Sequence, residues 1–296
     1  MRVLVTGAGG QLGRALLATQ PAGAAVVGLT RDELDIRDRD ALALALSEHQ
    51  PDWVFNAAAY NAVDAAETDE AAAYAVNFRA VATLAELCRA QGSRLLHLSS
   101  DFVYDGRSHK PYSPADRAVP LSVYGKSKLA GEEAVTGTLG SAALIVRTAW
   151  VYSRDGRSFV RAMLDRMRAG ESLRVVQDQV GTPTWVDPLA LTLWAATRAE
   201  LEGIHHWTPA GSASRYDLVV ALQEDAIACG VLEQPVEVVP ILSTELGMAA
   251  ERPAHCVLDK SATWAALGAT PPHWRVHLRA MLKGLTAADA QLGSAL

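Results

Sequence analysis

A tyrosine and a lysine four residues apart, Tyr124 and Lys128, are the pair whose types and spacing most directly predict chemistry in this sequence. At that spacing they lie on one face of the helix expected over residues 122–135. A phenol with an ordinary pKa near ~10 exchanges protons poorly at neutral pH, but a neighbouring ammonium group lowers that pKa. Ser99 and Ser100 end the preceding expected strand and offer hydroxyl groups to a substrate oxygen. The pattern predicts acid–base catalysis, and its plainer alternative is a tyrosine packed beside a surface lysine.

A glycine-rich turn, Gly7-x-x-Gly10-x-x-Gly13, follows a short apolar segment and precedes an expected helix. This is the setting that a dinucleotide-binding turn requires. The first glycine permits the tight turn, the second lets backbone N–H groups approach a diphosphate, and the third allows close packing of helix on strand. An ordinary glycine-rich turn is the alternative. With a dinucleotide in place, Lys128 could also reach the nicotinamide ribose.

The end of the second expected strand bears on which nicotinamide cofactor is bound. An acidic residue there favours NADH, because it hydrogen-bonds the ribose, whereas an arginine accommodates the 2′-phosphate of NADPH. Thr30 occupies the acidic position and Arg31 follows it, which predicts NADPH. NADH stays possible if Asp32 or Asp35 contacts the ribose instead.

The elements that must position these residues alternate between β and α along the first half of the chain. Strands are expected over residues 2–6, 24–29, 34–36, 53–56, 94–98 and 142–146, and helices over 14–19, 38–48, 69–91 and 122–135. Strands separated by helices of this length form right-handed crossovers and a parallel sheet. The sequence therefore predicts an α/β protein with a Rossmann-like, doubly wound parallel sheet.

The second half loses this alternation and carries eight of the prolines, between residues 183 and 272. Such a change predicts a smaller, irregular lobe over the carboxyl edge of the sheet. We expect an NAD(P)-binding domain over residues 1–150 and a mainly substrate-binding lobe over 151–296, with segments that may exchange between them.

Composition excludes several other classes of protein. The net charge is −6, and no basic stretch suits a nucleic acid. No apolar run approaches the ~18 residues that a membrane span needs. The three cysteines, Cys88, Cys229 and Cys256, lack metal-binding spacing, and the strand expected at residue 2 leaves no room for a signal peptide. We expect a cytoplasmic protein that is a monomer or homodimer.

Seven stretches together resemble the dTDP-4-dehydrorhamnose reductase family of extended short-chain dehydrogenases/reductases. They run in the family's order over residues 1 to about 260: GAGGQLG from Gly7, NAAAYNAVDAAE from Asn56, SSDFVYDG from Ser99, YGKSKLAGE from Tyr124, RTAWVY from Arg147, DQVGTPT from Asp178, and Arg252-Pro253. The resemblance implies reduction of a 4-keto sugar on thymidine diphosphate with hydride from a nicotinamide cofactor. The L-rhamnose precursor is the expected substrate.

The resemblance also implies roles for individual residues. Tyr124 would give a proton to the C4 oxygen, Lys128 would adjust Tyr124 and bind ribose, and Ser100 would steady the same oxygen. Besides the glycines and Arg31, the cofactor would contact Gln11, Leu12, Asp35, Ile36, Ala57, Ala58 and Ala59. The substrate would contact Asn61, Asp101, Trp150, Gln179 and Thr182 as well as Ser100 and Tyr124. For Trp150, a plain core aromatic is the alternative.

Departures from the family's pattern qualify this interpretation. Asn61 replaces the usual threonine near the sugar, so a related 4-keto sugar from a specialised deoxysugar pathway is an alternative substrate. Arg14-Ala15 lack the glutamate that holds magnesium in some members, so no metal is expected. His205 and His206 are adjacent, and on a strand their side chains would face opposite ways, so we interpret them as structural. A non-catalytic subunit resembling the regulatory subunit of methionine adenosyltransferase is the alternative from another class.

Overall fold

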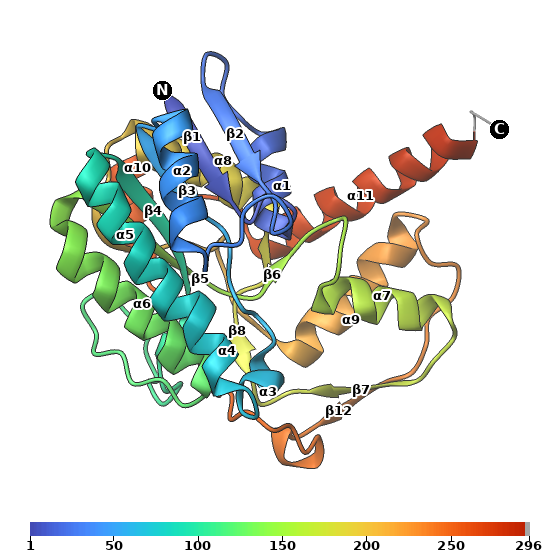
Figure 1. Ribbon diagram of the computed structural model, residues 1–296. Coiled ribbons are helices and arrows are strands. Elements are labelled where there is room, and N and C mark those ends of the chain that lie inside the picture. Colours follow the sequence, from blue (N-terminus) through green and yellow to red (C-terminus); the bar gives the residue numbers. More distant parts are fainter. Residues whose placement is uncertain (294–296) are drawn as a thin grey trace.

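The computed structural model describes residues 1–293, and its centre is a six-stranded sheet (Figure 1). The strand order is β10-β5-β4-β3-β1-β2, and every neighbouring pair is parallel. The bounds are β1 Arg2–Thr6, β2 Ala25–Leu29, β3 Trp53–Asn56, β4 Arg94–Ser100, β5 Ala143–Thr148 and β10 Gly203–His206. The expected Rossmann-like α/β fold with a parallel sheet is confirmed.

Helices cover both faces of this sheet, which explains why its central strands are continuously apolar. On one face α1 (Gln11–Ala18) packs on α8 (Val186–Arg198), over side chains such as Phe55 and Leu144. The other face carries α2 (Arg39–His49), α5 (Ala80–Gln91) and α6 (Val123–Leu139), over Leu4 and Val54. Alternate residues of one strand therefore enter two separate cores.

One expected strand is wrong. Residues 34–36 lie between and within two turns and pair with no strand, although Leu34 and Ile36 are buried in the core beneath α2. The Leu34 N–H group donates to the carbonyl of Thr30, and the Asp35 side chain pairs with Arg37. The apolar alternation therefore reflects burial against a helix and not pairing in the sheet.

The expected helix over residues 69–91 is present but interrupted. It consists of α4 (Glu70–Tyr74), a π-helical segment (Ala75–Arg79) and α5. Segments of π-helix inside a helix often occur at functional sites. This one includes Asn77, whose contacts are described below.

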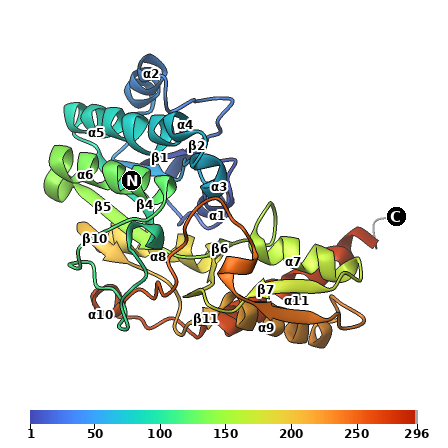
Figure 2. The same ribbon diagram turned by 90° about the horizontal axis from the view of Figure 1, so that it is seen from below.

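The second half builds a smaller lobe with its own core, seen beside the sheet in Figure 2. Leu164, Leu218, Leu222, Leu278 and Leu282 are buried there. The helices of this lobe are α7 (Phe159–Arg168), α9 (Arg215–Ala228) and α11 (Trp274–Gly293), with a 3₁₀ turn at Ser243–Glu245. The helix α10 (Ser261–Leu267) packs beside β10 of the main sheet. The strands are β6 (Val151–Tyr152), β7 (Leu173–Val176), β8 (Val180–Gly181), β9 (Thr184–Trp185), β11 (Ala213–Ser214) and β12 (Val238–Ile241).

The two halves are not separate along the chain, because α8 and β10 return to the main sheet. The division at residue 150 therefore stays a prediction about roles and does not mark a break in the fold. The remaining short elements are α3 (Val63–Ala66) and the 3₁₀ turns Asp101–Val103 and Gly140–Ala142. Within residues 1–293, no helix is both long and apolar enough to span a membrane.

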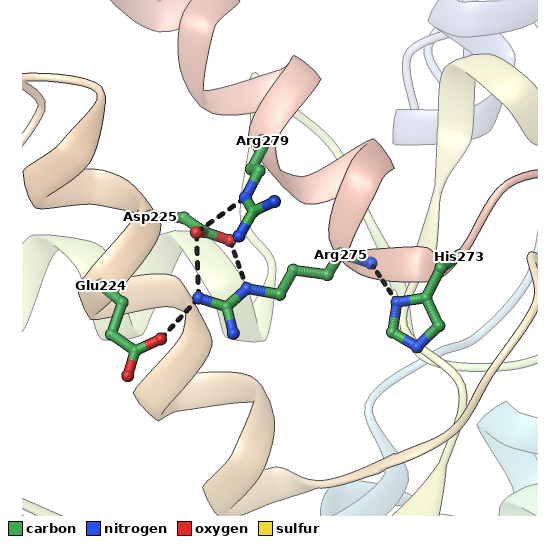
Figure 3. A network of polar contacts seen from close by, with 5 residues as sticks. All are labelled: Glu224, Asp225, His273, Arg275 and Arg279. Atoms are coloured by element: carbon green, nitrogen blue, oxygen red, sulfur yellow. Dashed lines mark hydrogen bonds and ion pairs between the residues drawn. The ribbon is translucent and has the colours of Figure 1, made fainter.

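A cluster of ions joins α9 to α11 in the smaller lobe (Figure 3). The Asp225 carboxylate, whose side chain is only 4% exposed, accepts hydrogen bonds from Arg275 and from Arg279. Arg275 also donates to Glu224, which is 59% exposed. A buried carboxylate with two guanidinium partners contributes more to stability than an exposed ion pair does.

This difference can be measured on two neighbouring positions. We expect Asp225→Asn to lower the free energy of unfolding by about 1–2 kcal/mol, because charged hydrogen bonds are lost while both arginines can still be hydrated. The control Glu224→Gln should cost less than about 0.5 kcal/mol. Urea unfolding of the two variants compares them, and equal losses would contradict the assignment.

Candidate active site

A cavity of about 410 Å³ lies at the carboxyl ends of β1, β3, β4 and β5. The neighbours of β1 are β2 on one side and β3 on the other, so the direction of the chain connections reverses here. Open α/β sheets bind ligands at such a switch point. The cavity is lined from both halves of the chain, including Gln11, Asn61, Tyr124, Trp150, Arg215 and Arg252.

The glycine-rich turn has the geometry that its sequence predicts. Gly7 has a φ of +69°, and a Cβ atom there would lie 2.7 Å from the backbone of Ala58. A Cβ atom on Gly13 would lie 2.4 Å from the carbonyl oxygen of Gly7. Gly7 and Gly13 therefore shape the turn, while Gly10, Gln11 and Leu12 line the cavity at the start of α1. The backbone N–H groups of this helix end can meet an anion there.

The Gln11 side chain connects this turn to the smaller lobe. Its amide nitrogen donates to the carbonyl of Arg157 at 3.0 Å, and its amide oxygen accepts from the Ser153 hydroxyl at 2.7 Å. A ligand on the backbone of the turn would therefore lie next to residues 153–157. Sequence reasoning treated Gln11 only as a cofactor contact and missed this bridge.

Residues 57–61, which follow β3, make two kinds of contact. Ala57, Ala59 and Asn61 line the cavity, whereas Ala58 packs against Gly7. The amide oxygen of Asn61 accepts a hydrogen bond from the Tyr124 hydroxyl at 3.4 Å. Asn61 is thus placed beside the expected proton donor, and its contact with a sugar stays a prediction.

Residues after β2 lie away from the cavity. The Arg31 side chain is exposed, and Thr30 donates to Glu33 through its N–H and its hydroxyl. The hydrogen bond from Arg37 lowers the pKa of Asp35 to about 2. The Ile36 side chain is buried in the core, so only its backbone could meet an adenine. The predicted cofactor contacts of Arg31, Asp35 and Ile36 stay predictions.

Tyr124 and Lys128 both occupy the first turns of α6, beneath the loop that follows β4. The Ser122 hydroxyl caps this helix by accepting from the Gly125 N–H group at 3.2 Å. A Cβ atom on Gly125 would lie 2.2 Å from the Phe102 carbonyl oxygen, so only glycine lets the helix approach the loop. Ser100, Tyr124 and Lys128 consequently line one cavity, as the sequence predicts.

The pKa of Tyr124 differs from our expectation. Burial raises it to about 12, the nearby Ser100 hydroxyl partly opposes this rise, and Asp101 adds to it. Burial also lowers the pKa of Lys128 to about 8, against the attraction of Glu132. The Lys128 ammonium donates to the carbonyl of Leu98 at 2.6 Å. The predicted lowering of the tyrosine pKa by Lys128 is therefore wrong, because the effect of burial is larger.

Asn77 is a positioning residue that sequence reasoning missed. Its side chain accepts from the Tyr60 N–H at 2.9 Å, and it donates to the Tyr60 carbonyl at 3.1 Å and to the Ser127 hydroxyl at 3.0 Å. The π-helical segment thereby holds residues 57–61 against the helix that carries Tyr124 and Lys128. The sequence does show Asn77 as a polar residue between the apolar Val76 and Phe78 of the expected helix, and this could have indicated a buried polar contact.

A guanidinium group and an indole ring form the wall contributed by the smaller lobe. The Arg215 guanidinium lies 3.6 Å from the centre of a Trp150 ring, and both residues line the cavity. A Cβ atom on Gly181 would lie 2.6 Å from the same indole. Burial lowers the pKa of Arg215 to about 10. Sequence reasoning identified Trp150 but not Arg215, since nothing local marks an arginine at the start of α9.

A second guanidinium group, that of Arg252, contributes to the same wall of the cavity. Arg252 lines the cavity and pairs with Asp64 of α3 at 2.6 Å, so it links the smaller lobe to the sheet domain. Arg252 formed part of the motif in the sequence but was not named as a site residue.

Two predicted substrate contacts do not line the cavity. The Gln179 side chain donates to the Ser243 hydroxyl at 3.0 Å, and the Thr182 hydroxyl donates to the carbonyl of Gly211 at 3.0 Å. Both residues are buried next to the wall formed by Trp150 and Gly181. Their contact with a nucleotide stays a prediction.

The two adjacent histidines make structural contacts. His206 is buried between the Tyr104 hydroxyl at 2.9 Å and the Asp259 carbonyl at 3.0 Å, and burial lowers its pKa to about 4. His205 contacts Thr263 and the carbonyl of Glu202. Within the described part of the chain, no three metal-binding side chains gather into a cluster.

Comparisons with known proteins agree with this geometry. Residues 1–287 match the family model described as the RmlD substrate binding domain. A dTDP-4-dehydrorhamnose reductase of Streptomyces griseus is 43% identical over 94% of this chain and 91% of its own length. A dTDP-4-keto-6-deoxy-D-glucose reductase of Streptomyces niveus is 39% identical over 94% and 95%, respectively.

A solved structure is similar over the same length. The dTDP-4-dehydrorhamnose reductase of Bacillus anthracis str. Ames, in complex with NADP, is 29% identical with a TM-score of 0.89 and covers 95% of this chain and 98% of that one. The chain therefore belongs to the family described by the RmlD substrate binding domain, and it is an oxidoreductase of the class that reduces dTDP-4-keto sugars.

Proposed function

We propose that this protein reduces the C4 keto group of a dTDP-4-keto-6-deoxy sugar with NADPH, converting dTDP-4-dehydro-L-rhamnose to dTDP-L-rhamnose. The observation that carries this proposal is the convergence of Ser100, Tyr124 and Lys128 on one cavity with the glycine-rich turn. The relatives named above reduce such sugars, and the Bacillus anthracis relative binds NADP.

The residues at the turn fit a dinucleotide. Gly10 precedes α1 with no side chain between the helix N-terminus and the cavity, and Gln11 and Leu12 continue the wall. The helix N-terminus would hold the diphosphate. Arg31 would meet the 2′-phosphate, and Lys128 would bind the nicotinamide ribose. When bound, NADPH supplies the hydride that reaches C4 of the sugar.

The side chains opposite the turn handle the sugar oxygen. Tyr124 gives its proton to the oxygen at C4 as that oxygen gains negative charge. Ser100 donates a hydrogen bond to the same oxygen, which stabilises the charge in a site shielded from water. The positive charge of Lys128 stabilises the phenolate of Tyr124 when a bound ligand takes the place of the Leu98 carbonyl as the partner of its ammonium group.

The wall of the smaller lobe suits the nucleotide diphosphate. Arg215 and Arg252 bring two guanidinium groups to the cavity. Each guanidinium group can donate two parallel hydrogen bonds to the oxygens of one phosphate. Trp150 offers a flat apolar face beside them.

The nature of the sugar has a specific alternative. Asn61 replaces a family threonine, and the Streptomyces niveus relative is a dTDP-4-keto-6-deoxy-D-glucose reductase. A reductase of a specialised deoxysugar pathway is therefore the second candidate. The reductase relatives argue against a non-catalytic regulatory subunit.

The mechanism is tested by removing the tyrosine hydroxyl. We expect Tyr124→Phe to lower kcat on dTDP-4-dehydro-L-rhamnose by about 10²–10⁴-fold while NADPH binding persists, because only proton transfer is lost. Lys128→Met should lower kcat and also weaken NADPH binding. The control Tyr74→Phe lies on α4, outside the cavity, and should behave like the native protein. NADPH oxidation and fluorescence titration measure the two effects, and a Tyr124→Phe variant with native turnover would refute the mechanism.

Cofactor preference is tested at Arg31. We expect tighter binding of NADPH than of NADH, and we expect Arg31→Ala to remove about 1.5–3 kcal/mol of the NADPH binding free energy. Arg39→Ala, which breaks only a surface pair with Glu86, is the control. Titrations with both cofactors decide this. Tighter binding of NADH by the native protein would contradict this and would indicate that Asp32 or Asp35 hydrogen-bonds the adenosine ribose.

Sugar preference is tested at Asn61. An amide both donates and accepts hydrogen bonds, whereas threonine has a shorter hydroxyl and a methyl group. Sites that hydrogen-bond a sugar hydroxyl discriminate strongly against analogues that lack that hydroxyl, because buried polar groups are then left unpaired. We expect Asn61→Thr to change the ratio of kcat/KM between two epimeric dTDP-4-keto sugars. A constant ratio with altered stability would make Asn61 a structural residue.

A further inference from the structure

Trp150 has a backbone conformation that residues of its size rarely adopt. Its φ is +45°, in the left-handed region, at the point where the chain leaves β5 for the smaller lobe. Its carbonyl accepts a hydrogen bond from the Thr184 N–H at 3.1 Å, where the pairing of β6 with β9 begins. Such a conformation is costly for a bulky residue and persists only where several contacts hold it, often at functional sites. The contacts of the indole ring therefore indicate what this position does.

Both faces of the Trp150 indole are covered by protein. The central carbon of the Arg215 guanidinium lies 3.6 Å from the centre of the ring. This places it over a face, because carbon atoms in contact are already about 3.5–4.0 Å apart. A Cβ atom on Gly181 would lie 2.6, 2.7 and 2.9 Å from three adjacent indole atoms, Cε2, Nε1 and Cζ2. Two groups this close to the same ring would overlap on one face, so they lie on opposite faces. With both faces covered, Trp150 cannot stack on a sugar ring.

The Arg215 guanidinium is held by aromatic rings but has no partner for its charge. The centre of the Phe159 ring lies 4.9 Å from the same guanidinium carbon, within the range of a cation–π contact. Within residues 1–293, Arg215 forms no ion pair, and its side-chain N–H groups donate to no protein acceptor. Arg252 differs, because it is paired with Asp64. The N–H groups of a guanidinium lie in its plane, so rings on its faces leave these donors available to a ligand in the cavity.

We propose that Trp150 is a positioning residue, which holds the Arg215 guanidinium flat against its ring so that Arg215 donates to the phosphate joined to the sugar. The choice of this phosphate follows from position. The carboxylate whose charge acts on Arg215 is that of Asp101, which lines the cavity and accepts from the Ser100 hydroxyl at 3.0 Å. Ser100 is the residue expected at the C4 oxygen, so Arg215 lies at the sugar end of the ligand. The inference rests on the proposed function only in taking a dTDP-sugar as that ligand.

Calorimetric titrations with dTDP, dTMP and dTDP-L-rhamnose test both residues. We expect Arg215→Met to weaken dTDP binding roughly 10–100-fold, because charge-assisted hydrogen bonds are lost, and to leave dTMP, which lacks that phosphate, almost unchanged. Trp150→Leu should weaken dTDP binding roughly 3–10-fold by releasing the guanidinium. It should weaken dTDP-L-rhamnose by the same factor, because no sugar contact is lost. In the Arg215→Met background, Trp150→Leu should have no further effect. The control Arg174→Met breaks an exposed pair with Glu245 outside the cavity.

Several outcomes would overturn this inference. A greater loss for dTDP-L-rhamnose than for dTDP in Trp150→Leu would mean that the indole contacts the sugar. Native dTDP affinity in Arg215→Met, or equal losses for dTDP and dTMP, would remove the phosphate from Arg215. If Trp150→Leu does not fold, Arg215→Lys keeps the charge without a flat group and should weaken dTDP binding as Arg215→Met does. Native affinity in Arg215→Lys would exclude a role for the stack. A protein that binds dTDP as expected but reduces no dTDP-4-keto sugar would instead overturn the proposed function and leave this inference intact.

Discussion

The site depends on backbone segments that approach one another more closely than a side chain would allow. Gly7 lets the first turn contact Ala58 after β3, and Gly125 lets the start of α6 contact the carbonyl of Phe102 after β4. These two contacts place the glycine-rich turn and the start of the helix that carries Tyr124 and Lys128 directly against the segments that follow β3 and β4. Since backbone atoms are less mobile than side-chain ends, the positions of the reacting groups are set by the fold itself.

Burial is the second constraint, and it favours the uncharged form of several groups in the cavity wall. It raises the pKa of Tyr124 and of Asp101, and it lowers that of Lys128. A site of this kind cannot keep an isolated charge at low cost. Reduction of a keto group creates one negative charge on oxygen, so proton transfer between hydrogen-bonded neighbours is favoured over a stable ion. This explains why a tyrosine with a raised pKa can still serve as a donor to an alkoxide.

Local sequence signals account for the elements and residues that were predicted. Strands such as Trp53–Asn56 are marked by continuous apolar residues, and the spacing of Tyr124 and Lys128 needs only the period of one helix. The strand predicted over residues 34–36 was wrong because alternating apolar residues indicate burial and not strand pairing. An irregular segment packed beneath a helix shows the same alternation. Arg215 was missed because its role depends on the packing of Trp150 some 60 residues earlier in the sequence, a contact that no local pattern encodes. Asn77 was missed because the π-helical segment that aims its side chain is a tertiary effect.

The division of labour between the halves follows from where each cavity residue originates. Ser100, Tyr124 and Lys128 come from the sheet domain, whereas Arg215 and Arg252 reach the cavity from segments after β10. Segments of the second half also belong to the sheet domain, because α8 packs on one face of the main sheet and β10 is its edge strand. The ion pair between Arg252 and Asp64 and the contacts of Gln11 with Ser153 and Arg157 further connect the two halves at the cavity. The cavity residues of the smaller lobe therefore depend on elements other than those that position Ser100, Tyr124 and Lys128.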